Sequence, residues 1–164
     1  MVSGWSYPAS PIISQDTPAR TLIEALWELS TMATEVVEEA DWYRIEYDDD
    51  LDALIHTWTM FSNGEQFREG ANALYEALKE YDVSKEIIDT REVKAHDEED
   101  KQWLQEEWIP KMVEAGMEYS ANVHRESVIA EMDMQETVDP LSDLPFENMM
   151  TDDMAEAREW IAEQ

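Results

Sequence analysis

Apolar residues near the start of the chain recur with a helical period. Thr17 is a plausible N-cap and Pro18 suits the first helical position, so a helix is predicted over 17–40. Residues 1–16, rich in Pro and Ser, are interpreted as a flexible lead-in. The helix must bury its apolar face against its own domain or a second subunit, which leaves a homodimer through 17–40 open. That face carries Leu22, Leu26, Leu29, Ala33 and Val36.

After Asp41 the pattern becomes that of strands. The aromatic-rich segment 42–47, the acidic turn 48–50 and the segment 53–61 predict a hairpin. Further strands are predicted over 84–89, 117–124 and 146–150. Helices are predicted between them over 62–81, 97–116 and 126–138, and a last one begins at Thr151. Ser62 and Glu65 fit a capping box, and Pro110 should kink or break its helix.

This alternation of strands and helices predicts a single α/β domain over 41–164. Right-handed crossovers would make most strands parallel and leave the first antiparallel. The expected fold is therefore a mixed, mostly parallel five-stranded sheet with helices packed on it, plus an N-terminal extra helix. A chain of 164 residues is long enough for one such core.

The charge of the chain indicates its solvent. Forty acidic residues face eleven basic ones, for a formal charge of -29, and the acids are interspersed with apolar residues. Such a surface repels itself in dilute buffer and is screened in molar salt. Its acid-rich, lysine-poor composition is similar to that of proteins from halophilic archaea. An acidic nucleic-acid mimic is the alternative, whereas direct binding of nucleic acid is disfavoured because no basic stripe exists.

Several classes of function lack a signal in the sequence. The chain has no Cys, which excludes disulfides and thiol catalysis, and three dispersed His residues that form no local metal motif. With four Gly residues, the chain is not expected to contain a phosphate-cradling loop, and no catalytic motif is present. We predict neither a cofactor nor a metal. Without a signal peptide or a membrane-length apolar run, a cytoplasmic location is expected.

Short motifs from about Trp42 to Glu163 resemble the STAS-like domains related to the sporulation anti-anti-sigma factor. The branch that they resemble most is STAS/CRAL-TRIO-like. The resemblance rests on the order and spacing of these motifs. The motifs are Trp58, FREG at 67–70, VSK at 83–85, DTR at 89–91, WLQEEWIP at 103–110 and AEAREW at 155–160.

The resemblance implies a non-catalytic regulatory module that binds a protein partner. In that family a Ser after the third strand, in a D-S-S-G-like sequence, is phosphorylated. This chain has Asp89, Thr90 and Arg91 there, so Thr90 is the hydroxyl available, and the acids around it would repel a phosphate. The departure argues against a kinase switch.

Two groups of residues are the candidate binding sites. Asp89, Thr90, Arg91 and His96 follow a predicted strand, where open α/β sheets bind ligands, although Asp89 and Arg91 could simply pair with each other. Aromatic residues at Trp58, Trp103 and Trp108 could line an apolar pocket for a lipid or other small hydrophobic molecule, contact a partner, or belong to the core. A protein-interaction module is the first expectation and a lipid-binding protein the second.

Overall fold

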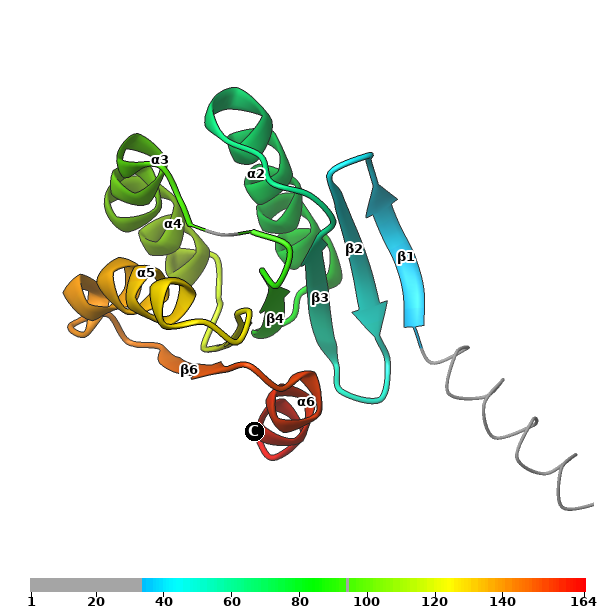
Figure 1. Ribbon diagram of the computed structural model, residues 1–164. Coiled ribbons are helices and arrows are strands. Elements are labelled where there is room, and N and C mark those ends of the chain that lie inside the picture. Colours follow the sequence, from blue (N-terminus) through cyan, green and yellow to red (C-terminus); the bar gives the residue numbers. More distant parts are fainter. Residues whose placement is uncertain (1–33, 94) are drawn as a thin grey trace, which may run out of the picture. The chain divides into compact units, whose positions relative to one another are not determined.

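The computed structural model describes residues 34–93 and 95–164. Its centre is a six-stranded sheet in the order β1-β2-β3-β4-β5-β6. The first three strands, β1 (Thr34–Glu39), β2 (Tyr43–Asp48) and β3 (Ala53–Trp58), form a meander, with β2 antiparallel to β3. Figure 1 shows β1 and β2 running in opposite directions. Since each strand follows its neighbour directly, short turns suffice to connect them.

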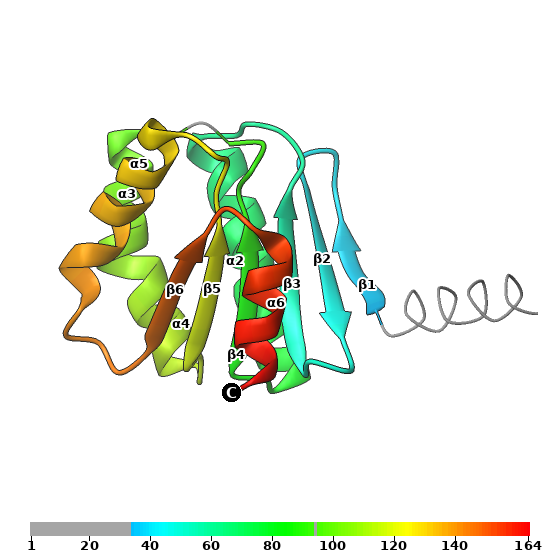
Figure 2. The ribbon, with the colours of Figure 1, turned by 60° about the horizontal axis from the view of Figure 1, so that its bottom comes forward.

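The second half of the sheet is parallel. Strands β4 (Lys85–Asp89), β5 (Tyr119–Val123) and β6 (Glu147–Thr151) continue from β3 through three parallel pairings. The crossovers contain α2 (Gly64–Tyr81), the run α3 (Glu98–Trp103), η2 (Leu104–Trp108) and α4 (Ile109–Glu114), and then α5 (Val128–Val138) with η3 (Asp139–Leu141). These helices cover one face of the sheet, and α6 (Met154–Ala162) covers the other (Figures 1 and 2).

The prediction of an α/β fold is confirmed, whereas a five-stranded, mostly parallel sheet is wrong. The additional strand is β1, which occupies the end of the predicted helix 17–40. Thr34, Val36 and Val37 are β-branched and favour a strand. Hydrogen bonds to the edge of β2 stabilise this strand more than the spacing of the apolar residues stabilises a helix. The remainder of that helix, the lead-in and the homodimer proposed through 17–40 lie outside the described residues.

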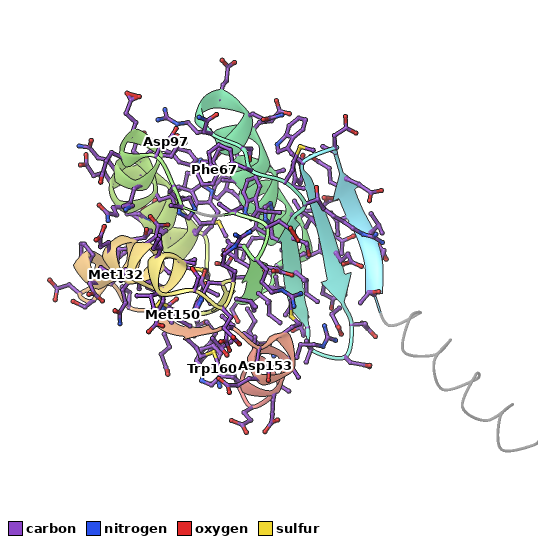
Figure 3. All side chains as sticks on the ribbon, viewed as in Figure 1. Phe67, Asp97, Met132, Met150, Asp153 and Trp160 are labelled. Atoms are coloured by element: carbon purple, nitrogen blue, oxygen red, sulfur yellow. The ribbon has the colours of Figure 1, made fainter. Side chains whose placement is uncertain are left out.

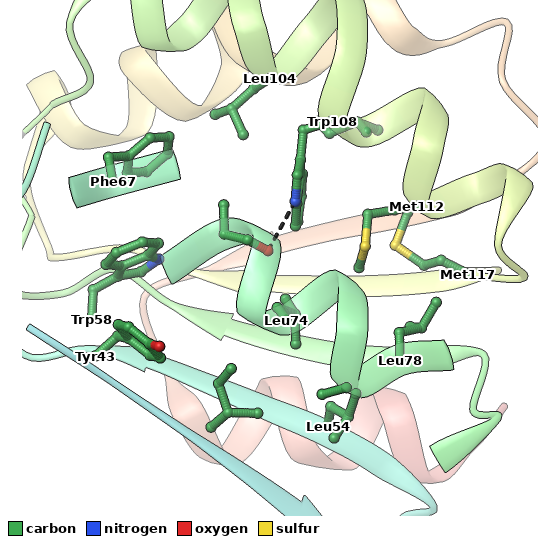
Figure 4. Close-up of a cluster of buried hydrophobic side chains, with 14 of the residues drawn as sticks. Tyr43, Leu54, Trp58, Phe67, Leu74, Leu78, Leu104, Trp108, Met112 and Met117 are labelled. Atoms are coloured by element: carbon green, nitrogen blue, oxygen red, sulfur yellow. Dashed lines mark hydrogen bonds between the residues drawn. The ribbon is translucent and has the colours of Figure 1, made fainter. Parts of the chain in front are cut away.

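Two hydrophobic cores hold the layers together. The smaller lies between the sheet and α6, where Ile55, Ile87 and Ala121 meet Ala157 and Ile161. The larger lies beneath the helices of the opposite face (Figure 4). Its buried residues are Tyr43, Ile45, Leu54, Trp58, Phe67, Ala71, Leu74, Ala77, Leu78, Val83, Val93, Leu104, Trp108, Ile109, Met112, Met117 and Leu141.

Pro110 interrupts its helix as expected. The run from Glu98 to Glu114 contains five π-helical residues, Leu104–Trp108, directly before Ile109 and Pro110. Because proline has no N–H to donate and its ring clashes with the preceding turn, the helix widens there and then resumes.

Two predicted caps are displaced. The N-cap of α2 is Asn63 rather than Ser62, and that of α6 is Asp153, whose carboxylate accepts from the Ala155 N–H, rather than Thr151.

A glycine sets the distance between α2 and the sheet. A Cβ at Gly70 would lie 2.7 Å from the Trp58 ring and 3.0 Å from the Tyr43 ring. We expect Gly70→Ala to lower the free energy of unfolding by about 1–3 kcal/mol, because overpacking outweighs the higher helix propensity of alanine. Urea denaturation in molar salt measures this. Glu80→Ala, on the exposed side of α2, is the control and should change stability by less than about 0.5 kcal/mol. An equally small effect at Gly70 would contradict the prediction.

Candidate cavity with a polar floor

A cavity of about 60 Å³ lies between the sheet and the helices of the larger core. Side chains from β3, β4, β5 and β6 form its floor, and α2, η2 and α5 supply much of its walls. The walls are mainly apolar and aromatic, with Trp58, Phe67 and Trp108 among them, and Figure 4 shows these three rings. Their further apolar members are Ala71, Leu74, Ile88, Leu104, Ile109, Met117, Met134, Val138 and Phe146.

The floor is polar where the three parallel strands β4, β5 and β6 lie side by side. Glu86 is opposite Ser120, which is opposite Asn148, so all three project from the same face of the sheet. The Ser120 hydroxyl donates to Glu86 Oε1 at 2.9 Å. Asn122 Nδ2 donates to Asn148 Oδ1 at 2.6 Å and, at 3.4 Å, to the Ser120 oxygen. These bonds form a connected polar strip beneath apolar walls.

His56 is the polar residue of the adjoining strand. Its Nε2 donates to the carbonyl of Gly70 at 3.0 Å, which fixes the proton on that nitrogen and leaves a lone pair on Nδ1. Nδ1 is buried and has no hydrogen-bond partner. The imidazole stacks on the Tyr43 ring, with 5.6 Å between the ring centroids. Burial lowers the pKa of His56 to about 4, against the opposing effect of the Gly70 carbonyl, so the ring is neutral.

Glu86 is a buried acid without a cationic neighbour in the cavity. Its side chain is almost fully enclosed, and Oε2 has no hydrogen-bond partner. Among the described residues that line the cavity, none is Lys or Arg. Burial raises the pKa of Glu86 to about 7, although the hydrogen bond from Ser120 acts in the opposite direction. The carboxyl group can therefore gain or lose a proton near neutral pH.

A second buried acid nearby has a lysine and a histidine as partners. Asp133 of α5 accepts from His96 Nδ1 at 2.8 Å and lies 2.9 Å from the Lys101 ammonium. Burial alone would raise the pKa of Asp133, but these hydrogen bonds outweigh it and lower the pKa to about 2. The cluster joins α5 to the segment before α3, and the His96 ring also lines the cavity. The contacts of Asp133 connect α5 to α3 and to the segment before it.

The structure divides the predicted site residues into two groups. Thr90, His96, Trp58 and Trp108 line the cavity. Asp89, Arg91 and Trp103 do not. The Arg91 guanidinium makes two hydrogen bonds to the Asp89 carboxylate, at 3.0 and 2.8 Å, which is the pairing that the sequence left open.

Thr90 has a structural contact. Its hydroxyl is buried and donates to the carbonyl of Val123 at 3.0 Å. The hydroxyl is thus withdrawn from the surface.

The polar floor has no motif in the sequence. Glu86, Ser120, Asn122 and Asn148 lie in predicted strands, and His56 is one of three dispersed His residues that form no local metal motif. A signal was present, because the strand segments carry polar residues at alternate positions, as at Ser120 and Asn122. The register between strands is what joins them into one strip.

Other kinds of site find no support in the described part of the chain. Over 34–93 and 95–164, no group of three or more His, Asp or Glu side chains could hold a metal ion. In the same ranges, every helix is too short or too polar to cross a membrane. The sequence matches no protein-family model and no curated protein. The resemblance to STAS-like domains thus stays a prediction.

Glu86 should make folding stability depend on pH. The folded protein keeps this proton up to about pH 7, whereas the unfolded chain, with a pKa of 4.5, releases it earlier. The folded state holds more protons between these values, so the contribution of Glu86 is lost as the pH rises. The free energy of unfolding of Glu86→Gln, relative to that of the wild type, should therefore increase by about 3 kcal/mol between pH 4.5 and pH 8.

Urea denaturation of both proteins across this range measures the difference. His56 acts in the opposite direction, since its lowered pKa removes stability as the pH falls from 6.5 towards 4, but it does so in both proteins. Glu80→Gln, on an exposed position, is the control. A difference that stays constant with pH for Glu86→Gln would refute the prediction.

Proposed function

We propose that this protein binds a small molecule in the cavity beneath α2 and η2. The observation that carries the proposal is the pair of buried polar atoms, His56 Nδ1 and Glu86 Oε2, that lack hydrogen-bond partners at the floor of an apolar cavity. An unsatisfied buried polar group costs about 1–3 kcal/mol. Interior polar atoms are normally satisfied by protein, water or a ligand.

The size of the cavity restricts the ligand. A volume of about 60 Å³ exceeds the ~10–15 Å³ needed for one water and is well below the ~300–1,000 Å³ of a typical drug-sized site. The expectation of a lipid is therefore replaced by that of a compact molecule with a polar group and a short apolar part. Trp58 and Trp108 would contact the apolar part, and the strip around Glu86 the polar part.

The ligand should remain bound when the protein is purified gently. Native mass spectrometry from molar salt is expected to show a small mass in addition to the polypeptide, which denaturation releases. Ala71→Leu should remove this mass, because the larger side chain fills the cavity that Ala71 lines. Ala73→Leu, on the same helix but outside the lining, should retain it. A wild-type protein without any bound mass would contradict the proposal.

A second candidate function, protein binding, rests on the outer side of α5. Val128, Ile129 and Met132 are 73%, 72% and 54% exposed, and positions i, i+1 and i+4 adjoin on a helix surface (Figure 3 labels Met132). Exposed apolar residues that cluster mark interaction sites more often than isolated ones do. Glu126 and Glu131 lie beside them in sequence and favour a partner with basic residues around its apolar contact.

This surface can be tested by comparing variants in pull-downs at molar salt. The double variant Ile129→Ser and Met132→Ser should lose at least one protein that the wild type retains, because its apolar contact area is removed. Val36→Ser is the control, since Val36 is also exposed but lies on β1. Identical sets of bound proteins for the wild type and the double variant would rule out α5 as the docking helix.

A further inference from the structure

We propose that the ligand of the cavity is a small organic cation, a short-chain molecule with a protonated amino group that pairs with Glu86. This inference rests on the proposed binding function and specifies its ligand class. Three features of the cavity support it: the charge of Glu86, the unpartnered acceptor atoms of His56 and Glu86, and the aromatic side chains of the wall.

Glu86 lacks a compensating positive charge in the described lining of the cavity. Glu86 is the one acid among the described residues that line the cavity, and no Lys or Arg of that lining faces it. The other titratable groups of the lining are His56 from β3 and His96 from the segment before α3. A buried carboxylate is costly unless a cation and hydrogen bonds compensate for it. Asp133 has a lysine ammonium and hydrogen bonds within the protein, whereas Glu86 has one hydrogen bond, from Ser120 to Oε1, and no cation among the described residues of the lining. A cationic ligand would supply the missing charge.

The two unpartnered polar atoms of the described lining, His56 Nδ1 and Glu86 Oε2, both require a hydrogen-bond donor. His56 Nδ1 is an acceptor, because Nε2 carries the proton that is donated to Gly70. Ionised Glu86 Oε2 is also an acceptor. His56 and Glu86 project from the same face of adjacent strands, since Glu86 is opposite Leu54 in the register and His56 is two residues further along. An ammonium group has three donors and can donate to more than one acceptor, whereas a hydroxyl group has one donor.

The aromatic wall of the cavity also favours a cation. Trp58, Phe67 and Trp108 are buried rings that line the cavity, and the Trp58 ring lies 4.6 Å from that of His56. The faces of aromatic rings attract cations, and tryptophan does so most strongly. Trp108 is held in place by its N–H, which donates to the carbonyl of Ala71 at 2.9 Å (Figure 4). A carboxylate below rigid aromatic rings is a combination that selects ammonium ions over neutral molecules of the same shape.

The test compares three probes of similar size and different charge. Propylammonium, 1-propanol and propionate are titrated against the full chain in molar salt at pH 8, with intrinsic tryptophan fluorescence and calorimetry as readouts. Propylammonium should bind roughly ten- to a hundredfold more tightly than 1-propanol, the factor expected for a hydrogen bond between charged groups. Propionate should not bind, because Glu86 repels it. Lowering the pH to 5.5 should weaken the binding of propylammonium, since Glu86 is then protonated.

Variants assign the preference to Glu86. Glu86→Gln should abolish the preference for propylammonium over 1-propanol, whereas Glu118→Gln, an exposed control, should keep it. Glu86→Asp retains the charge and serves if Glu86→Gln does not fold, which circular dichroism shows. It should keep a preference for the cation.

The outcomes separate this inference from the proposed function. Equal binding of propylammonium and 1-propanol by the wild type, with both lost in Ala71→Leu, would overturn the cation and leave the binding cavity standing. A failure of all three probes, together with no bound mass in native spectra, would overturn both.

Discussion

The site depends on two consecutive carbonyl groups in the middle of α2. The carbonyl of Gly70 accepts from His56 on β3, and that of Ala71 accepts from Trp108 on η2. Helix carbonyls can accept a second hydrogen bond, so α2 connects the sheet below it to the helix beside it without loss of its own ladder. The absence of a side chain at Gly70 permits this close approach, because a Cβ would collide with Trp58. These contacts set the distances between α2, the sheet and η2, and therefore the size of the cavity between them.

Two buried acids in the same layer show how environment decides protonation. Asp133 is paired with His96 and Lys101, and its pKa falls to about 2, so its charge helps to join α5 to the preceding helical segment. Glu86 has a hydroxyl from Ser120 as its partner, and burial raises its pKa to about 7. Burial alone would raise both pKa values, and the hydrogen bonds to Asp133 from His96 and Lys101 reverse the direction for that acid. In a protein of net charge -29, Glu86 thus has a protonation state that can change near neutral pH.

The sequence predicted most of the elements but not the role of each residue. Strands with clear alternation, such as β2 and β5, lie close to their predicted ranges, because one face of each is buried. The segment Thr34–Glu39 was assigned to a helix because its spacing is compatible with one, and the edge of β2 decided otherwise. Trp58, Trp103 and Trp108 were candidate pocket residues from their aromatic nature and the family resemblance, and Trp58 and Trp108 line the cavity. Glu86 was overlooked because an acid in a chain with forty acids is no signal by itself.

By itself, the sequence determined the α/β class, the approximate segments and the break at Pro110, since these follow from local periodicity and from the geometry of single residues. Only the tertiary structure decided which polar residues share one face. Glu86, Ser120 and Asn148 are separated by 34 and 28 positions in sequence and become neighbours through the register of three parallel strands. Parallel register is set by crossover helices and layer packing, which are long-range interactions. A cavity is likewise a property of two layers and the space that they leave, and it has no counterpart in local sequence.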